Sequence, residues 1–229
     1  MTPLEKVVQA VEGRNPEEMW VGERIARKCV HSQAPARGKL CLTGIGKETQ
    51  QFACDLVKTV FQDETDEGML TTIQLDFAKV PRGMPDTAEI RLKRFLKAEF
   101  RRMGHDVHQN YLALADWEKW DFYYHLEAWM MNRRPNSLVV LLQNYDALFD
   151  GIAEEDAKAM QVVFSGMRPF LKVLEMYEGR LRFFVMTGVR VRRCCGMAGE
   201  PEFASESVFD ASKPVTFFTH GIKEALRFG

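Results

Sequence analysis

The sequence lacks a long apolar run and any CxxC cysteine motif. The longest uninterrupted apolar run is Leu138–Leu142, far below the roughly 20 residues that cross a bilayer. The five cysteines form an odd set without a CxxC pair, which favours a reducing compartment over a disulfide framework. The amino terminus carries Glu5 and Glu12, unlike a signal or transit peptide. We therefore expect a cytoplasmic or nuclear protein that does not associate with membranes.

The chain also lacks an excess of charge of either sign. It has 31 Lys and Arg residues against 32 Asp and Glu residues, for a net charge of -1, so the chain as a whole does not attract nucleic acid. Local basic clusters remain at Arg91–Arg102 and Arg190–Arg193. Each cluster is typical of a solvated surface, and each is also a candidate contact for nucleic acid or phosphate. We expect no metal site, because His105 and His108 have too few further ligands near them in the sequence.

Short apolar runs alternate with helical patterns along the chain, which is typical of a parallel sheet covered by helices. The expected strands are Leu40–Thr43, Thr72–Asp76, Ser137–Leu142, Leu181–Thr187 and Val215–Phe218. The expected helices are Pro3–Val11, Glu17–Val30, Glu48–Phe61, Thr87–Met103, Tyr111–Met131 and Glu154–Tyr177. This order predicts a three-layer α/β sandwich with a five-stranded, mainly parallel sheet in residues 38–229. Residues 1–37 are expected to form a helical segment packed against the edge of that sheet.

A glycine-containing loop follows the first expected strand. Leu40–Thr43 runs into Gly44, Ile45, Gly46 and Lys47 and then into a helix. Glycines let backbone N–H groups approach phosphate oxygens, a helix N-terminus favours anions, and a lysine reaches the outer phosphates. The segment is therefore either a phosphate-binding loop or an ordinary strand-to-helix turn.

Three further segments favour the phosphate-binding interpretation. Ser137–Asp150 (SLVVLLQNYDALFD) resembles the Walker B strand of the AAA-ATPase-like family, in which an apolar run precedes IDEYDxPL. Thr71–Phe77 resembles the second strand of that family, and Leu181–Val189 resembles its sensor strand. Members of the family are often fused to a restriction-type nuclease domain, and related modules occur in crinkler effectors and retrotransposon hot-spot proteins. The resemblance implies a P-loop NTPase fold whose first strand lies beside the sensor strand.

The same resemblance locates departures from the family pattern. Glu48 stands where the family has the Ser or Thr that binds Mg²⁺, in a loop that is shorter than usual. Gln143 and Asn144 stand where the family has the magnesium-linked Asp and the catalytic Glu, and an amide cannot act as a general base. The resemblance implies nucleotide contacts by Gly44, Gly46, Lys47, Thr49, Asp146 and Thr187. It implies phosphate or partner contacts by Arg190, Arg192 and Arg193.

These departures favour a pseudo-ATPase with no catalytic residue and no resident metal, and leave the use of ATP and Mg²⁺ as cofactors open. The expected role is a protein-interaction scaffold in a larger assembly. Its expected contacts are Trp20, the helix that carries Trp117 and Trp129, and the loop Arg190–Cys195, although aromatic residues at helical spacing are equally typical of a core.

Two other functions stay open. One is a weakly active ATPase that uses Lys47, Thr49 and Asp146 in an altered geometry. The other is a nucleic-acid-binding module that uses the two basic clusters.

Overall fold

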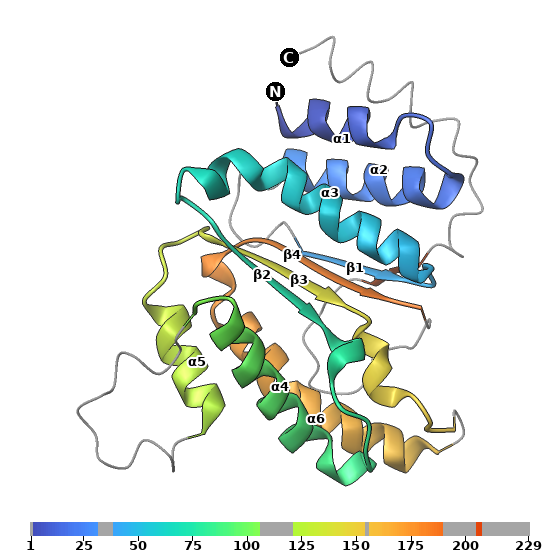
Figure 1. Cartoon of the computed structure of the whole chain (residues 1–229), viewed down its shortest axis with the longest axis vertical. Helices are drawn as coiled ribbons and strands as arrows, with labels where there is room; N and C mark the ends of the chain where they lie inside the picture. The colour runs from blue at the N-terminus through green and yellow to red at the C-terminus, as the bar shows by residue number, and fades with distance from the viewer. Residues whose placement is uncertain (1, 32–38, 106–120, 154–155, 190–204, 208–229) are drawn as a thin grey trace.

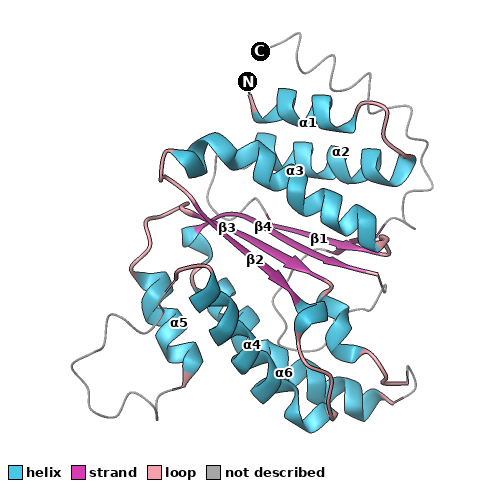
Figure 2. Cartoon of the chain, viewed as in Figure 1, coloured by secondary structure: helices cyan, strands magenta, loops and turns pink. Residues whose placement is uncertain are grey.

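A computed structural model describes residues 2–31, 39–105, 121–153, 156–189 and 205–207 of the chain. The chain builds a parallel sheet with helices on both faces, as Figures 1 and 2 show. The predicted α/β class and the parallel sheet are therefore confirmed. None of the helices in these ranges is both long enough and apolar enough to cross a membrane.

The sheet has four main strands in the order β2-β3-β4-β1, all parallel. They are β1 (Lys39–Thr43), β2 (Thr71–Asp76), β3 (Leu138–Gln143) and β4 (Leu181–Gly188). The first strand lies beside the fourth, as the family resemblance implies.

The prediction of five full strands is wrong in its count. Only a three-residue strand, β5 (Ser205–Ser207), pairs with the outer side of β1. Its sequence is Ser-Glu-Ser, so it joins the sheet through backbone pairing and carries no apolar pattern from which to predict it. The expected strand Val215–Phe218 lies outside the described residues.

Six α-helices are described, and their positions follow the predicted order. They are α1 (Pro3–Val11), α2 (Pro16–His31), α3 (Lys47–Asp66), α4 (Ala88–Arg102), α5 (Phe122–Met131) and α6 (Ala157–Met176). Short 3₁₀ turns include η1 (Phe77–Lys79), η2 (Pro85–Thr87), η5 (Tyr145–Phe149) and η6 (Glu178–Arg180). Nearby side chains fix where three of these helices begin. Thr2 and Glu5 form a capping box at α1, and Asp121 and Asp156 accept backbone N–H groups at α5 and α6.

The sheet separates two apolar cores. Along β3, Val140 and Leu142 face the core beneath α4, α5 and α6, whereas Val139 and Leu141 face the core beneath α1, α2 and α3. All six side chains of β3 are buried, which explains why its first five residues form a continuous apolar run instead of an alternation. Figure 1 shows these two helical layers above and below the strands.

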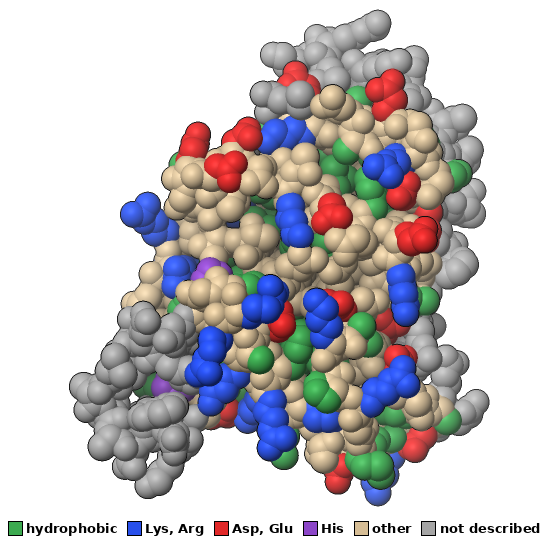
Figure 3. Space-filling model, in the orientation of Figure 1, with side chains coloured by type: hydrophobic (Ala, Val, Ile, Leu, Met, Phe, Trp, Pro, Cys, Tyr) green, Lys and Arg blue, Asp and Glu red, His purple; other side chains and the backbone are tan. Residues whose placement is uncertain are grey.

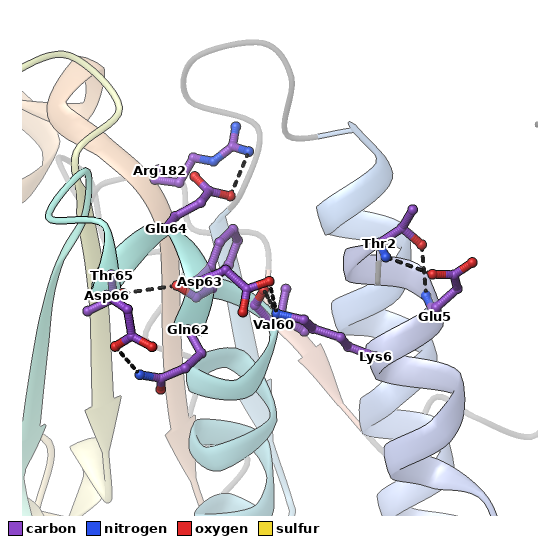
Figure 4. Close-up of polar contacts among 11 residues, drawn as sticks. Thr2, Glu5, Lys6, Val60, Gln62, Asp63, Glu64, Thr65, Asp66 and Arg182 are labelled. Carbon is purple, nitrogen blue, oxygen red and sulfur yellow. Dashed lines mark hydrogen bonds and ion pairs between the residues drawn. The ribbon is translucent and has the colours of Figure 1, made fainter.

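Helices α1 and α2 form an N-terminal hairpin that packs on α3 and β1. Their close approach requires Gly22, because a Cβ there would lie 2.2 Å from Cγ1 of Val11. Near the far end of α3, the Nζ of Lys6 lies 3.0 Å from Oδ2 of Asp63 and 3.4 Å from the carbonyl oxygen of Val60 (Figure 4). At the hairpin turn, the guanidinium of Arg14 lies over the Phe52 ring. The hairpin thus contacts α3 along most of its length.

Two aromatic residues expected at a partner surface belong to the cores instead. Trp20 is buried in the core under the hairpin, and Trp129 is buried beside Phe100 in the core under α4 and α5. Trp117 and the loop Arg190–Cys195 lie outside the described residues. The prediction that Trp20 and Trp129 contact a partner is therefore wrong, because internal packing already covers both rings.

Candidate functional site

The connection from β1 to α3 is a three-residue turn, Gly44, Ile45 and Gly46, at the carboxyl end of the sheet. Gly44 has φ +75°, a left-handed conformation that glycine adopts without strain. Ile45 is fully buried, and its N–H donates to the carbonyl of Gly188 at the end of β4, 3.4 Å away. One N–H of the turn is therefore committed to the sheet and does not face a ligand.

A carboxylate from α2 lies at the start of α3. Oε1 of Glu17 accepts the N–H of Gly46 over 3.1 Å, and Oε2 of Glu17 accepts the hydroxyl of Thr49 over 2.7 Å. Gly46 is the N-cap of α3 and brings no side chain of its own to that position. Glu17 therefore serves as a cap supplied from another helix, at the helix end that favours negative charge.

Lys47 and Glu48 open α3 and are both exposed. Neither side chain forms an ion pair or hydrogen bond with another described residue. Thr49 is buried, and its hydroxyl points to Glu17. The structure thus places the predicted phosphate-loop residues at the N-terminus of a helix, with the hydroxyl of Thr49 already engaged.

The side chain of Gln143, the last residue of β3, is part of a chain of amides. Its Oε1 accepts from Nε2 of Gln74 over 2.7 Å, and its Nε2 donates to Oε1 of Gln51 over 3.1 Å. Nε2 of Gln51 in turn donates to both carboxylate oxygens of Asp55, at 2.9 Å each. These bonds run in one direction from β2 through β3 to α3. Gln143 is 5% exposed, so the network satisfies a buried amide at both of its polar atoms.

A second set of contacts holds Asn144 and Thr187. The Asn144 side chain donates to Oδ1 of Asp76 over 2.8 Å, and its backbone N–H donates to Oε1 of Gln50 over 3.0 Å. The same oxygen of Gln50 lies 3.0 Å from the hydroxyl of Thr187, which is fully buried. Nε2 of Gln50 donates to the carbonyl of Ile45. Gln50 therefore joins the ends of β1, β3 and β4.

Asp146 and Gly188 meet where β3 and β4 end. Asp146 is buried in η5, and its Oδ1 accepts the N–H of Val189 over 3.4 Å. A Cβ on Gly188 would lie 2.4 Å from the Tyr145 ring and 2.8 Å from Oδ1 of Asp146. A glycine is thus required at position 188 for this contact between the two strand ends.

Burial shapes the chemistry of a nearby thiol. Desolvation raises the pKa of Cys54 from 9.0 to about 12, with Lys58 opposing the shift and Asp55 and Asp76 adding to it. Cys54 is therefore a thiol, and not a nucleophilic thiolate, at neutral pH. Among the described residues, no group of three or more His, Cys, Asp or Glu side chains is arranged to hold a metal ion.

The carboxyl end of the sheet brings together most of the residues singled out in the sequence. They are Gly44, Gly46, Lys47, Glu48, Thr49, Gln143, Asn144, Asp146 and Thr187. Arg190, Arg192 and Arg193 lie outside the described residues. Sequence reasoning missed Glu17, Gln50, Gln51, Gln74 and Asp76. The alternation of polar and apolar residues in β2 was a usable signal for Gln74 and Asp76, whereas no local signal marks Glu17.

A parallel sheet of this strand order, with a glycine turn leading from β1 into a helix, is consistent with the fold of P-loop-like α/β proteins. A profile of the AAA-ATPase-like family, described as "Predicted AAA-ATPase", matches residues 47–193, well over half of the chain. The chain belongs to this family. No curated protein and no solved structure matches it significantly. The match begins at Lys47, so the hairpin and the glycine turn precede it.

Proposed function

We propose that this chain is a catalytically impaired member of the AAA-ATPase-like family that acts as a protein-interaction scaffold. The observation that carries the proposal is the amide chain through Gln143. A magnesium-linked Asp in this family keeps its oxygens for the metal and its water. Here both polar atoms of Gln143 are used by Gln74 and Gln51, inside the chain.

The other side chains at the positions that would contact Mg²⁺ and a nucleotide are also hydrogen-bonded to residues of the chain itself. The hydroxyl of Thr49 donates to Glu17, so a metal would have to compete with that bond. The side chain of Asn144 donates to Asp76 and has no basic atom with which to take a proton from water. These residues, placed as they are, do not fit a magnesium–nucleotide complex, and this misfit supports a module without hydrolysis.

The ATPase reaction tests the first half of the proposal. We expect ATP with Mg²⁺ to be hydrolysed no faster in the presence of the purified chain or of a Lys47→Ala variant than in buffer without protein. Calorimetry should detect no ATP affinity in the micromolar range. A magnesium-dependent rate that disappears in Lys47→Ala would contradict the proposal and favour the weakly active ATPase.

Exposed apolar side chains near the junction of α4 and α6 support the second half of the proposal, the scaffold role. Gly166 of α6 packs against the backbone of Ala88 and Glu89, where η2 leads into α4. Near this junction Met84 is 70% exposed and Ile90 is 53% exposed. Such apolar side chains are candidate contacts for a protein partner.

Retention of a partner from native extract tests the scaffold role. The wild type and Lys47→Ala should retain the same partner, because the role does not depend on nucleotide. A Met84→Ser/Ile90→Ser variant should lose it. Equal retention by all three proteins would place the contact elsewhere, and loss in Lys47→Ala alone would tie retention to the glycine turn.

A second candidate function is nucleic-acid binding through α4. Lys93 pairs with Glu89 and Asp121, and Arg102 pairs with Glu99. Arg94, Lys97 and Arg101 are exposed and form no ion pair with another described residue. Figure 3 shows Lys and Arg side chains gathered over the region of α4. This unneutralised stripe is the observation that favours the second candidate.

A further inference from the structure

The N-terminal hairpin brings a charged side chain to each end of α3, in addition to Glu48 in the first turn of that helix. The last turn of α3 holds no basic residue, and its N-cap is Gly46, without a capping side chain. Glu17 contacts the N-terminus through Gly46 and Thr49, and Lys6 contacts the C-terminal part through Val60 and Asp63. A negative group at the N-terminus and a positive group at the C-terminus both oppose the helix dipole.

The bonding of Glu17 is that of an anion held by neutral donors. Glu17 forms no ion pair with another described residue; its two oxygens are bound by one backbone N–H and one hydroxyl. The neighbouring Glu18 differs, because its carboxylate lies 3.8 Å from the guanidinium of Arg14. Backbone N–H groups and a first-turn hydroxyl at a helix N-terminus are the donors that bind phosphate oxygens in P-loop proteins.

We propose that Glu17 is an intramolecular substitute for phosphate, and that the docked hairpin and a phosphate oxyanion at the start of α3 exclude each other. This inference rests on the proposed function, since it names the group of the chain that takes the place of a nucleotide phosphate. The carboxylate of Glu17 lies close to the glycine turn, because a Cβ on Gly46 would be only 3.8 Å from Oε2 of Glu17. A phosphate at the same donors would meet a negative charge at contact distance.

Apolar packing keeps the hairpin in place. Val21 and Ile25 of α2 are fully buried in the core that α3 shares with β1. Displacing Glu17 by moving α2 would expose these side chains to water. In the wild type, phosphate alone therefore does not displace Glu17. Removing the charge of Glu17 is the direct way to make the N–H of Gly46 and the hydroxyl of Thr49 available to phosphate.

The test compares phosphate binding by Glu17→Gln, Glu17→Ala and the wild type. Inorganic phosphate, and separately ATP without Mg²⁺, are titrated by calorimetry at constant ionic strength. We expect both variants to bind inorganic phosphate about tenfold or more tightly than the wild type, because a like charge is removed at close range. Glu18→Gln is the control: it removes the same charge from the same helical turn, and should leave the affinity at the wild-type value.

The outcomes are decisive even if Glu17→Ala is unstable. Glu17→Gln retains an acceptor for Gly46 and Thr49, and circular dichroism melting shows whether it stays folded. Equal phosphate affinity in Glu17→Gln and the wild type, including no binding by either, overturns the proposal. So does an equal gain in Glu18→Gln. A gain for ATP but not for inorganic phosphate also overturns it, because that gain would come from the nucleoside.

Failure of this inference and failure of the proposed function are distinguishable. Hydrolysis of ATP by the wild type would refute catalytic impairment, whatever the Glu17 variants bind. Unchanged phosphate affinity in those variants would refute the exclusion of phosphate by Glu17, whatever the hydrolysis rate is.

Discussion

The side chain of Gln143 donates a hydrogen bond to that of Gln51 over 3.1 Å, which ties the end of β3 to the beginning of α3. The pair joins β3 to the helix that follows the turn after β1. P-loop proteins carry their magnesium-linked and phosphate-binding motifs at the end of such a strand and at the start of such a helix. In a working ATPase a magnesium ion bridges these motifs. Here two neutral amides bridge them directly, so the link needs neither metal nor nucleotide.

We predict that Gln143→Glu destabilises the fold. A carboxylate still accepts from Gln74 but cannot donate to Gln51, and it buries a charge facing the oxygen of that side chain. We expect the free energy of unfolding in urea at pH 7 to fall by about 1–3 kcal/mol. Gln62→Glu is the control: the side chain of Gln62 is exposed and, among the described residues, bonds that of Asp66 alone, so the loss of stability should stay below about 0.5 kcal/mol. Equal losses would show that the amide chain adds nothing to stability.

We predict that Gly188→Ala also destabilises the fold, through steric overlap. The new Cβ would lie 2.4 Å from the Tyr145 ring, which is fully buried, so the ring or the backbone would have to shift to accommodate it. The expected cost is about 1–3 kcal/mol. Gly179→Ala introduces the same methyl group where nothing lies within 4 Å, and should change stability by less than about 0.5 kcal/mol. Thermal melting of both variants checks this, and a stable Gly188→Ala would mean that η5 shifts easily.

The strands and helices could be predicted wherever the pattern has a single physical cause. Leu138–Leu142 is apolar without interruption because both of its faces are buried, so a run of five such residues indicated a strand. Thr2 and Glu5 have capping-box spacing, which agrees with the start of α1 at Pro3. The predicted helix Tyr111–Met131 instead begins, within the described residues, at Phe122 with Asp121 as its N-cap.

The contacts of the site could not be predicted, because they depend on how distant elements are placed. Glu17 reaches Thr49 only after α2 has packed on α3, and no local pattern distinguishes it from Glu18. Gln74 and Gln143 meet because of the register between β2 and β3, which single-sequence reasoning does not supply. The sequence named the amide at position 143 as a departure from a family pattern, but not the partners that it bonds.

We predict that Cys54 resists alkylation and makes stability depend on alkaline pH. With its pKa raised to about 12 by burial, the folded thiol keeps its proton over a range in which the unfolded thiol, with a pKa near 9.0, loses it. The unfolded state therefore binds fewer protons, and stability falls as the pH rises from about 9 to 12, by at most about 1.4 kcal/mol per pH unit. The decline should be shallower in Cys54→Ala. Peptide mapping after iodoacetamide treatment at pH 8 should find Cys54 unmodified in the native chain and modified in urea; rapid native modification would contradict the burial.

The last prediction tests whether the basic face of α4 binds nucleic acid or is only exposed to solvent. Arg94, Lys97 and Arg101 share one face of α4 and span about 10 Å along its axis, a length that reaches neighbouring phosphates of a single strand. If this stripe binds nucleic acid, a fluorescent single-stranded DNA oligonucleotide should bind with an affinity that falls as salt rises. Changing all three residues to Gln should then reduce the slope of log affinity against log salt by about 2.

The control for this experiment removes the same charge from the opposite helical layer. Arg14, Arg27 and Lys58 pair with Glu18, Glu23 and Asp55, so their acidic partners already neutralise them. Their triple change to Gln should leave the slope close to that of the wild type. Because both variants lose three positive charges, a purely global electrostatic effect would lower both slopes equally. That outcome, or no binding by the wild type at low salt, would leave the α4 stripe as a solvated surface and remove nucleic acid from the candidate partners of this helix.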